Sequence, residues 1–156
     1  MSFIRAQKYL EKKNLKDRII VLNDFSGTVI DAAKALKTKP GNIVKTMALS
    51  VFDKPILILL SGDYKLSNSK FKEEFGCKPK MIDAQELDKV IGHEKSGICP
   101  FGINEDITVY FDESLKKYDL LYPACGTDNS AVKLTLSDLN SLNINKKWID
   151  VGIIIE

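Results

Sequence analysis

One stretch of this chain sets its architecture: Ile43-Val44-Lys45-Thr46-Met47-Ala48-Leu49-Ser50-Val51-Phe52. It is rich in β-branched and apolar residues, which is typical of a strand. The turn-forming sequence Asp53-Lys54-Pro55 follows, and then a second apolar run from Ile56 to Leu60. The turn predicts that the chain reverses here. Because the second run has no polar face, we expect it to form a central strand that is covered on both sides.

Lys45 is the residue in this stretch that does not fit a purely structural strand. Side chains alternate along a strand, so Lys45 shares one side with Met47, Leu49 and Val51, which belong in a core. An ammonium group on that side must lie near a cleft or pair with an anion, because burying an unpaired charge costs free energy. Lys45 is therefore the first candidate functional residue. The alternative is a lysine at a strand edge whose stem packs and whose charged end reaches water.

The remaining sequence alternates irregularly between helical and extended patterns. We expect helices over residues 2–13, 29–36, 69–75, 84–90 and 137–142, and further strands over residues 19–22, 80–82, 107–111, 119–122, 131–134 and 148–155. Thr28, Asp83 and Ser137 stand where helix N-caps are expected. No repeat or linker separates these segments, so residues 1–156 are interpreted as a single α+β domain, a mixed sheet with helices packed around it.

Composition limits the classes of function. The chain has 23 Lys and Arg against 21 Asp and Glu, a net charge of +2, which permits contact with nucleic acid but does not by itself favour it. The longest apolar run, residues 56–60, is too short to span a bilayer, so no membrane partner is expected. With one histidine and three widely spaced cysteines, no metal site is expected. Free thiols of this kind favour a cytoplasmic protein.

Two loops carry residues suited to binding. The first, residues 92–102, contains three glycines and a proline and has no periodicity. Its backbone N–H groups can approach a ligand and hold a developing negative charge, although a surface loop that needs positive φ angles is an equally simple interpretation. The second, residues 125–130, is a cluster of turn formers and most simply a hairpin loop. The only histidine, His93, is either a structural residue or a general base.

Several segments of the sequence together resemble a known family. The segments Gly41 to Thr46, Pro55 to Leu60, Gly92 with Ser96 to Gly102, Gly126, and Leu134 to Leu139 occur in the order and spacing of the YbaK/EbsC family. These proteins are free-standing relatives of the editing domain of bacterial prolyl-tRNA synthetases. The similarity runs from about residue 18 to residue 142. It implies a strongly twisted, mixed, barrel-like sheet with surrounding helices.

The resemblance also implies an activity, the hydrolysis of the ester that joins a wrong amino acid to the 3′ end of a tRNA. Lys45 matches the residue that binds and orients the aminoacyl-adenosine end, with Thr46 as its neighbour, and Gly126 is expected to admit the end of the substrate. The implied partner is the 3′ end of an aminoacyl-tRNA, expected to be a tRNA for proline. Prolyl-tRNA synthetase is a second candidate partner, which could recruit the protein. No metal or organic cofactor is implied.

The loop of residues 96–100 is implied to hold the carbonyl group of the amino acid. Gly97, Ile98 and Cys99 are expected to offer backbone donors, Pro100 to rigidify the loop and Ser96 to stand at its start. The side chain of Cys99 is expected to line the pocket rather than to act as a nucleophile. An aminoacyl ester is already activated, so orientation and backbone stabilisation of the oxyanion suffice, with the nucleophile activated by the substrate itself.

The sequence differs from the family at two places, and the second, a difference from the cysteine-specific members, leaves the amino acid open. Ser96 stands where many relatives have glycine, and Ala131 with Thr127-Asp128-Asn129 replaces a basic pair and an acidic residue. Cysteinyl, alanyl, seryl and threonyl esters are all candidate substrates. Two other classes of function stay open as alternatives: a non-catalytic module that binds tRNA or a synthetase, and a small-molecule aminoacyl-ester hydrolase. The oligomeric state does not follow from the sequence.

Overall fold

The structure is a computed structural model that describes residues 2–24 and 27–156. Its helices are α1 (Ser2–Lys12), α2 (Val29–Ala35), α3 (Asn68–Phe75), α4 (Leu87–Val90) and α5 (Leu136–Ser141). Its strands are β1 (Ile19–Val21), β2 (Val44–Val51), β3 (Lys54–Ser61), β4 (Tyr64–Leu66), β5 (Lys80–Met81), β6 (Thr108–Asp112), β7 (Leu120–Leu121), β8 (Ser130–Val132), β9 (Leu134–Thr135), β10 (Asn145–Ile149) and β11 (Gly152–Ile154).

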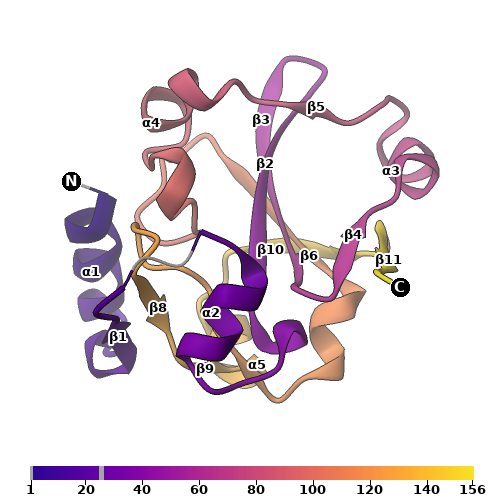
Figure 1. Ribbon diagram of the computed structural model, residues 1–156. Coiled ribbons are helices and arrows are strands. Elements are labelled where there is room, and N and C mark those ends of the chain that lie inside the picture. The colour runs from indigo at the N-terminus through magenta and orange to yellow at the C-terminus, as the bar shows by residue number, and fades with distance from the viewer. Residues whose placement is uncertain (1, 25–26) are drawn as a thin grey trace.

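The main sheet is mixed and has five strands in the order β10-β6-β3-β2-β5 (Figure 1). The hairpin β2–β3 is antiparallel, whereas β6 runs parallel to β3 and β10 runs parallel to β6. The central position predicted for the apolar run of residues 56–60 is confirmed, and so is the α+β class. The other described strands pair as β1-β8, β4-β11 and β7-β9, and no closed barrel forms among residues 2–24 and 27–156, so "barrel-like" describes the sheet only loosely.

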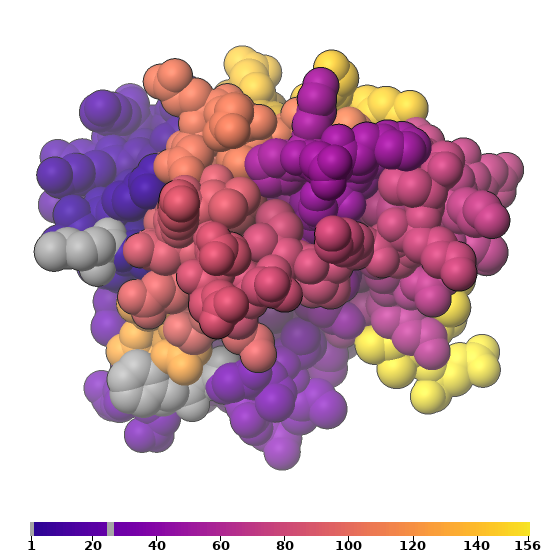
Figure 2. Space-filling view, turned by 90° about the horizontal axis from the view of Figure 1, so that it is seen from above, coloured from indigo at the N-terminus to yellow at the C-terminus, as the bar shows by residue number. Residues whose placement is uncertain are grey.

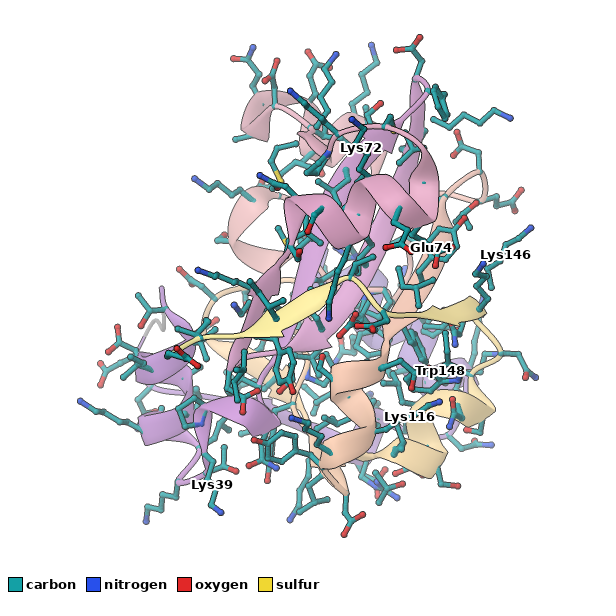
Figure 3. All side chains as sticks on the ribbon, turned by 90° about the vertical axis from the view of Figure 1, so that its right-hand side faces the viewer. Lys39, Lys72, Glu74, Lys116, Lys146 and Trp148 are labelled. Atoms are coloured by element: carbon teal, nitrogen blue, oxygen red, sulfur yellow. The ribbon has the colours of Figure 1, made fainter. Side chains whose placement is uncertain are left out.

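Alternation along β3 gives the sheet a hydrophobic core on each face. Leu57 and Leu59 join the larger core, which includes Ala6 and Leu10 of α1. The alternate residues of β3 face a second core that includes Phe71 of α3. Accordingly, α1 and α3 lie on opposite sides of the β2–β3 hairpin (Figure 1). Lys116 and Trp148 form a cation–π contact at the edge of the sheet, with Nζ 4.4 Å from the ring centroid (Figure 3).

A third, smaller cluster joins α2 to the start of β2. It consists of Ala33, Ile43, Tyr122 and Ala131, with Val29, Ala32 and Leu36 packed against it. The predicted N-cap is confirmed, because the Thr28 side chain accepts a hydrogen bond of 3.0 Å from the amide of Asp31. This cluster buries few large side chains, and it is where the molecule leaves room for a ligand.

Two predictions about the C-terminal third were wrong. The N-cap of α5 is Thr135, which forms a capping box with Asp138, and not Ser137. The expected continuous strand over residues 148–155 is divided into β10 and β11. The physical reason is the buried carboxylate of Asp112, which accepts hydrogen bonds from the amides of Val151 at 2.8 Å and Gly152 at 3.1 Å. The chain therefore leaves the main sheet there and pairs with β4 instead.

The prediction for residues 84–90 was correct only in part. This segment is a 3-10 turn, Ala84–Glu86, followed by the short helix α4, and the side chain of Asp83 makes no capping hydrogen bond. Across the described segments, none of the helices is long and apolar enough to cross a membrane.

Candidate functional site

Lys45 lies near the start of β2, on the strand face that packs toward α3. It stands opposite Leu60 in the hairpin, and Met47 and Leu49 follow it on the same side in the second core. The side chain is half-buried, and its ammonium donates a hydrogen bond to the backbone carbonyl of Tyr64 in β4. Alternation along the strand therefore places the cation where the sequence predicted it, at the end of an apolar row.

The electrostatics around Lys45 involve one carboxylate that follows β3. Burial lowers the pKa of Lys45 from its usual 10.5, and the negative charge of Asp63 opposes this effect in part. Asp63 accepts hydrogen bonds from the hydroxyl groups of Ser61 at 2.6 Å and Tyr118 at 2.7 Å. Burial disfavours ionisation of Asp63, but these hydrogen bonds outweigh it, so the pKa of Asp63 lies below its usual value. A fixed carboxylate thus stabilises the charged form of Lys45.

His93 holds the glycine-rich loop to α1 and is not open to solvent. It is fully buried, with Nδ1 3.0 Å from the hydroxyl of Ser2 and Nε2 in contact with the carbonyl of Phe101. A carbonyl can only accept, so Nε2 carries the proton and Nδ1 accepts from Ser2. The structural interpretation of His93 fits this geometry, because neither ring nitrogen is available to a ligand.

The two loops singled out in the sequence meet backbone to backbone. A Cβ atom built on Gly97 would stand 2.1 Å from the carbonyl carbon and oxygen of Gly126, so only glycine allows this approach. The amide of Gly97 donates to the carbonyl of Glu94 at 2.9 Å and is therefore not free to hold a developing negative charge in this conformation. Gly97 acts here as the contact point between the loops, in contrast to the donor role expected of it.

The other predicted loop residues occupy different environments. Ser96 is exposed, Ile98 is half-buried against the larger core, and Pro100 is buried. Cys99 is fully buried, and this burial raises the pKa of its thiol to about 12. The Cys99 side chain therefore lies in the core, and not at the surface of a pocket as expected, and it is an inert thiol at neutral pH.

Thr46 and Gly126 lie close to the site in the chain but do not face it. Thr46 follows Lys45 and so points to the opposite face of β2, where its hydroxyl is buried and has no hydrogen-bond partner among the described residues. Gly126 has a φ angle of +82°, and a Cβ atom there would meet the backbone of Ser2.

Lys45 and residues of both loops line a cavity of about 160 Å³, the Lys45 cavity. Its walls come from α2, the start of β2, the glycine-rich loop and the loop before β8. The lining residues are Leu22, Thr28, Val29, Ala32, Leu36, Ile43, Val44, Lys45, Ser96, Tyr122, Ala124, Thr127, Asp128, Ser130 and Ala131. It is mostly apolar, with one cation, one carboxylate and several hydroxyl groups at its walls. Lys45 and Ser96, which are far apart in the sequence, thus face one space.

Sequence reasoning missed Asp63, Asp128 and the contribution of α2. The position of Asp63 could have been predicted from the hairpin. Lys45 pairs with Leu60, so the residues that follow Leu60 in the chain lie beside Lys45. Asp128 was noticed as part of a turn and as a difference from the cysteine-specific members, but not as a candidate site residue. The packing of α2 over the cavity depends on contacts between distant segments, which no local pattern reveals.

No cluster of His, Cys, Asp and Glu able to hold a metal ion occurs in the parts of the chain that the structure describes. The residues that line the Lys45 cavity offer an ammonium group, a carboxylate and several hydroxyl groups.

Comparison with known proteins gives a consistent result. A family model described as an aminoacyl-tRNA editing domain matches residues 26–142. The uncharacterized protein YwhH of Bacillus subtilis (strain 168) is 36% identical over 152 residues, which cover 97% of each chain. A proline--tRNA ligase of Limosilactobacillus fermentum is 28% identical over 95 residues, 57% of this chain but only 17% of the ligase.

Among solved structures, the crystal structure of a proposed trans-editing enzyme for prolyl tRNA synthetase superposes with a TM-score of 0.87. The two sequences are 25% identical, and the match covers 97% of each chain. The resemblance noted in the sequence is confirmed by these matches. The chain belongs to the family of aminoacyl-tRNA editing domains.

Proposed function

We propose that this protein hydrolyses the ester of a mischarged aminoacyl-tRNA, with the aminoacyl group held in the Lys45 cavity. The observation that carries this proposal is the convergence of Lys45, Ser96 and Asp128 on one small, largely apolar space. Membership of the editing-domain family supports the reaction class. The relatives among proline--tRNA ligases support a tRNA for proline as the nucleic acid.

The size of the Lys45 cavity favours a small amino acid. Pockets that enclose a drug-sized ligand have volumes of about 300–1,000 Å³. At about 160 Å³ the Lys45 cavity suits an aminoacyl group but not a whole nucleoside. A protein that edits small amino acids needs such a pocket, because a binding site distinguishes one methylene group by only about 10–200-fold.

The charged groups at the cavity wall suit the fixed parts of every aminoacyl ester. Asp128 supplies a carboxylate for the α-ammonium group, and Lys45 supplies a cation for the oxygen atoms of the ester. The amides of Ile98 and Cys99 donate no hydrogen bond within the described residues, so they stay as candidate donors to the carbonyl oxygen. The attacking water is activated by the substrate itself in this mechanism, since the only histidine is buried and bonded on both nitrogens.

The direct test is a panel of tRNAs for proline that carry alanine, serine, cysteine, threonine or proline, together with the matching aminoacyl-adenosines. We expect at least one mischarged tRNA to be deacylated and prolyl-tRNA to be spared. Lys45→Ala should lower kcat/KM by about 100-fold, the usual effect of removing one group that stabilises a developing charge. Lys72→Ala, an exposed lysine on α3, is the matched control and should leave the rate unchanged (Figure 3).

Two outcomes would contradict the proposal. If wild-type protein turns over none of these esters, it is a binding module. If it turns over aminoacyl-adenosines with no preference for the complete tRNA, it is a small-molecule hydrolase. Circular dichroism of Lys45→Ala must show a folded protein, because otherwise its loss of activity says nothing about the site.

A further inference from the structure

The first helix, α1, contacts both of the loops that contribute to the Lys45 cavity. Figure 2 shows its indigo residues at the left of the molecule, beside the red segment that contains the glycine-rich loop. Two residues of α1 make these contacts: Ser2, which is 7% exposed, and Arg5, which is half-buried. Helix α1 lies outside residues 26–142, so these contacts are additional to the part of the chain that the family model matches.

The hydroxyl group of Ser2 fixes the turn that carries Ser96. It accepts a hydrogen bond of 3.2 Å from the amide of Glu94 and donates one of 3.0 Å to Nδ1 of His93. The carbonyl of Glu94 in turn accepts from the amide of Gly97 at 2.9 Å, which closes the 3-10 turn around Ser96. Because Ser96 lines the Lys45 cavity, its place in the wall depends on a hydrogen bond to Ser2.

The backbone of Ser2 fixes the position of the second loop. A Cβ atom built on Gly126 would stand 2.5 Å from the carbonyl carbon and oxygen of Ser2, so a larger residue there would push the loop away from α1. Two residues later in the chain, Asp128 lines the Lys45 cavity. Ser2 thus contacts the loop that carries Ser96 and the loop that carries Asp128, the two loop residues on which the proposed function depends.

Arg5 contacts both ends of the glycine-rich loop. A Cβ atom on Gly92 would stand 2.4 Å from a guanidinium nitrogen of Arg5, and one on Gly102 would stand 2.6 Å from the carbonyl oxygen of Arg5. The guanidinium also donates a hydrogen bond of 3.1 Å to the side chain of Asn104. Both glycines have positive φ angles, +108° and +70°. These two glycines therefore let the loop close against α1, which accounts for them without a ligand.

We infer that Ser2 and Arg5 are positioning residues that set the selectivity of the site among aminoacyl esters. This inference rests on the proposed function. Neither residue lines the Lys45 cavity, so each acts through the loops that it contacts. Because Ser96 and Asp128 come from different loops, a helix that contacts both loops fixes the distance between the two side chains. A site that distinguishes esters differing by one methylene group needs this distance to be constant, since a misplacement of about 1 Å can lower a rate about 100-fold.

The test measures kcat/KM of Ser2→Ala and of wild type on two esters of the tRNA for proline: the mischarged ester that wild type hydrolyses fastest, and the prolyl ester. We expect the ratio of the two kcat/KM values to fall about tenfold or more in Ser2→Ala, because the loops no longer keep their spacing. A loss of folded protein lowers both values by the same factor and leaves the ratio unchanged. The ratio therefore separates positioning from stability.

Ser67→Ala is the matched control for Ser2→Ala. Ser67 is also a buried serine, 8% exposed, and its hydroxyl group accepts a hydrogen bond from the amide of Lys70 at the start of α3. Its ester ratio should equal that of wild type. Arg5→Ala is a second test on the same helix and should lower the ratio as Ser2→Ala does. Lys8→Ala, an exposed lysine of α1, is its control and should leave the ratio unchanged.

Amide hydrogen exchange follows the same link without turnover. We expect the amide of Gly97 to exchange about tenfold faster or more in Ser2→Ala than in wild type, because the Glu94 carbonyl that it bonds is no longer held. In Ser67→Ala the amide of Gly97 should exchange at the wild-type rate.

Two results would overturn the inference: an ester ratio that both Ser2→Ala and Arg5→Ala leave unchanged, or a Gly97 amide that exchanges in Ser2→Ala as it does in wild type. Failure of the proposed function is a different result. In that case wild type hydrolyses none of the esters, while the exchange of the Gly97 amide still responds to Ser2→Ala.

Discussion

Lys45 owes its properties to its position at the end of an apolar row. Burial removes part of the water around its ammonium group, which disfavours the charge, while Asp63 and the carbonyl of Tyr64 favour it. The net effect is a pKa below the usual 10.5. A cation held in this way is already desolvated and oriented, so it interacts more strongly with a developing negative charge than an exposed lysine does.

The lowered pKa of Lys45 predicts the alkaline limit of the activity. If the ammonium form is required, kcat/KM should fall as the pH rises through the pKa of Lys45, and this fall should lie below pH 10.5. Lys45→Arg keeps its charge to a higher pH, since the pKa of a guanidinium exceeds about 12, so the same fall should disappear in that variant. The measurement is a pH–rate profile on aminoacyl-tRNA, corrected for spontaneous hydrolysis of the ester.

The substitution Asp63→Asn tests the same pKa, that of Lys45. It removes the negative charge that raises the pKa of Lys45, so the alkaline fall in kcat/KM should move to lower pH than in wild type. An alkaline limit that stays in place in both Lys45→Arg and Asp63→Asn would mean that another group titrates.

At the scale of elements, the contact between the two loops depends on Gly97. Gly97→Ala would place a methyl group 2.1 Å from the backbone of Gly126, so the loops must separate. We expect the free energy of unfolding to fall by about 1–3 kcal/mol, the usual effect of overpacking, together with a loss of editing activity. Urea denaturation monitored by the fluorescence of Trp148 measures the first effect.

Gly27→Ala is the control for that substitution. Among residues 2–24 and 27–156, a Cβ atom at Gly27 meets nothing within 4 Å, so the free energy of unfolding should change little. Equal stability of Gly97→Ala and wild type would show that the loops are not in contact in solution.

His93 connects α1 to the glycine-rich loop, and this link should depend on pH. Burial lowers the pKa of His93 below its usual 6.5, so the unfolded chain binds a proton that the folded chain does not. The contribution of His93 to stability is therefore complete above pH 6.5 and is lost as the pH falls from 6.5 through the lowered pKa. Because the chain has one histidine, a loss of stability in this range should be absent in His93→Gln. Denaturant titrations of both proteins between pH 7.5 and pH 5 test this, and equal slopes against pH would contradict it.

The elements that could be predicted from the sequence are those with a strong local pattern. Alternation and the expected chain reversal were sufficient for the β2–β3 hairpin, and the apolar run was sufficient for its central strand. The turn itself was placed too late, because Phe52 and Asp53 form it with positive φ angles, and Lys54 and Pro55 already pair in β3. The division of the C-terminal strand was not predictable in this way, because it depends on the buried carboxylate of Asp112, a residue far away in the chain. The cap of α5 was misplaced because Thr135 and Ser137 are both good N-cap residues, and only the hydrogen bonds of Asp138 distinguish them.

At the scale of the whole molecule, the candidate site is an assembly of segments that are separate in sequence. Lys45 comes from the central hairpin, Ser96 from the glycine-rich loop and Asp128 from the loop before β8. Lys45 was predictable because a charge broke an apolar pattern, and Ser96 because its loop resembles a known family. Asp63 was missed although the β2–β3 pairing places it near Lys45, whereas the packing of α2 over the cavity was not predictable, since it depends on contacts between distant segments. The boundaries of the domain, taken as residues 1–156, stay a prediction.

The central claim is that the aminoacyl group of the substrate lies in the Lys45 cavity, with its ester next to Lys45. The most direct measurement is a crystal structure with an alanyl-adenosine analogue whose ester is replaced by a stable amide. We predict the aminoacyl group in the Lys45 cavity and the linking amide within hydrogen-bond distance of Lys45 Nζ. A bound analogue that contacts neither Lys45 nor Ser96 would contradict this arrangement.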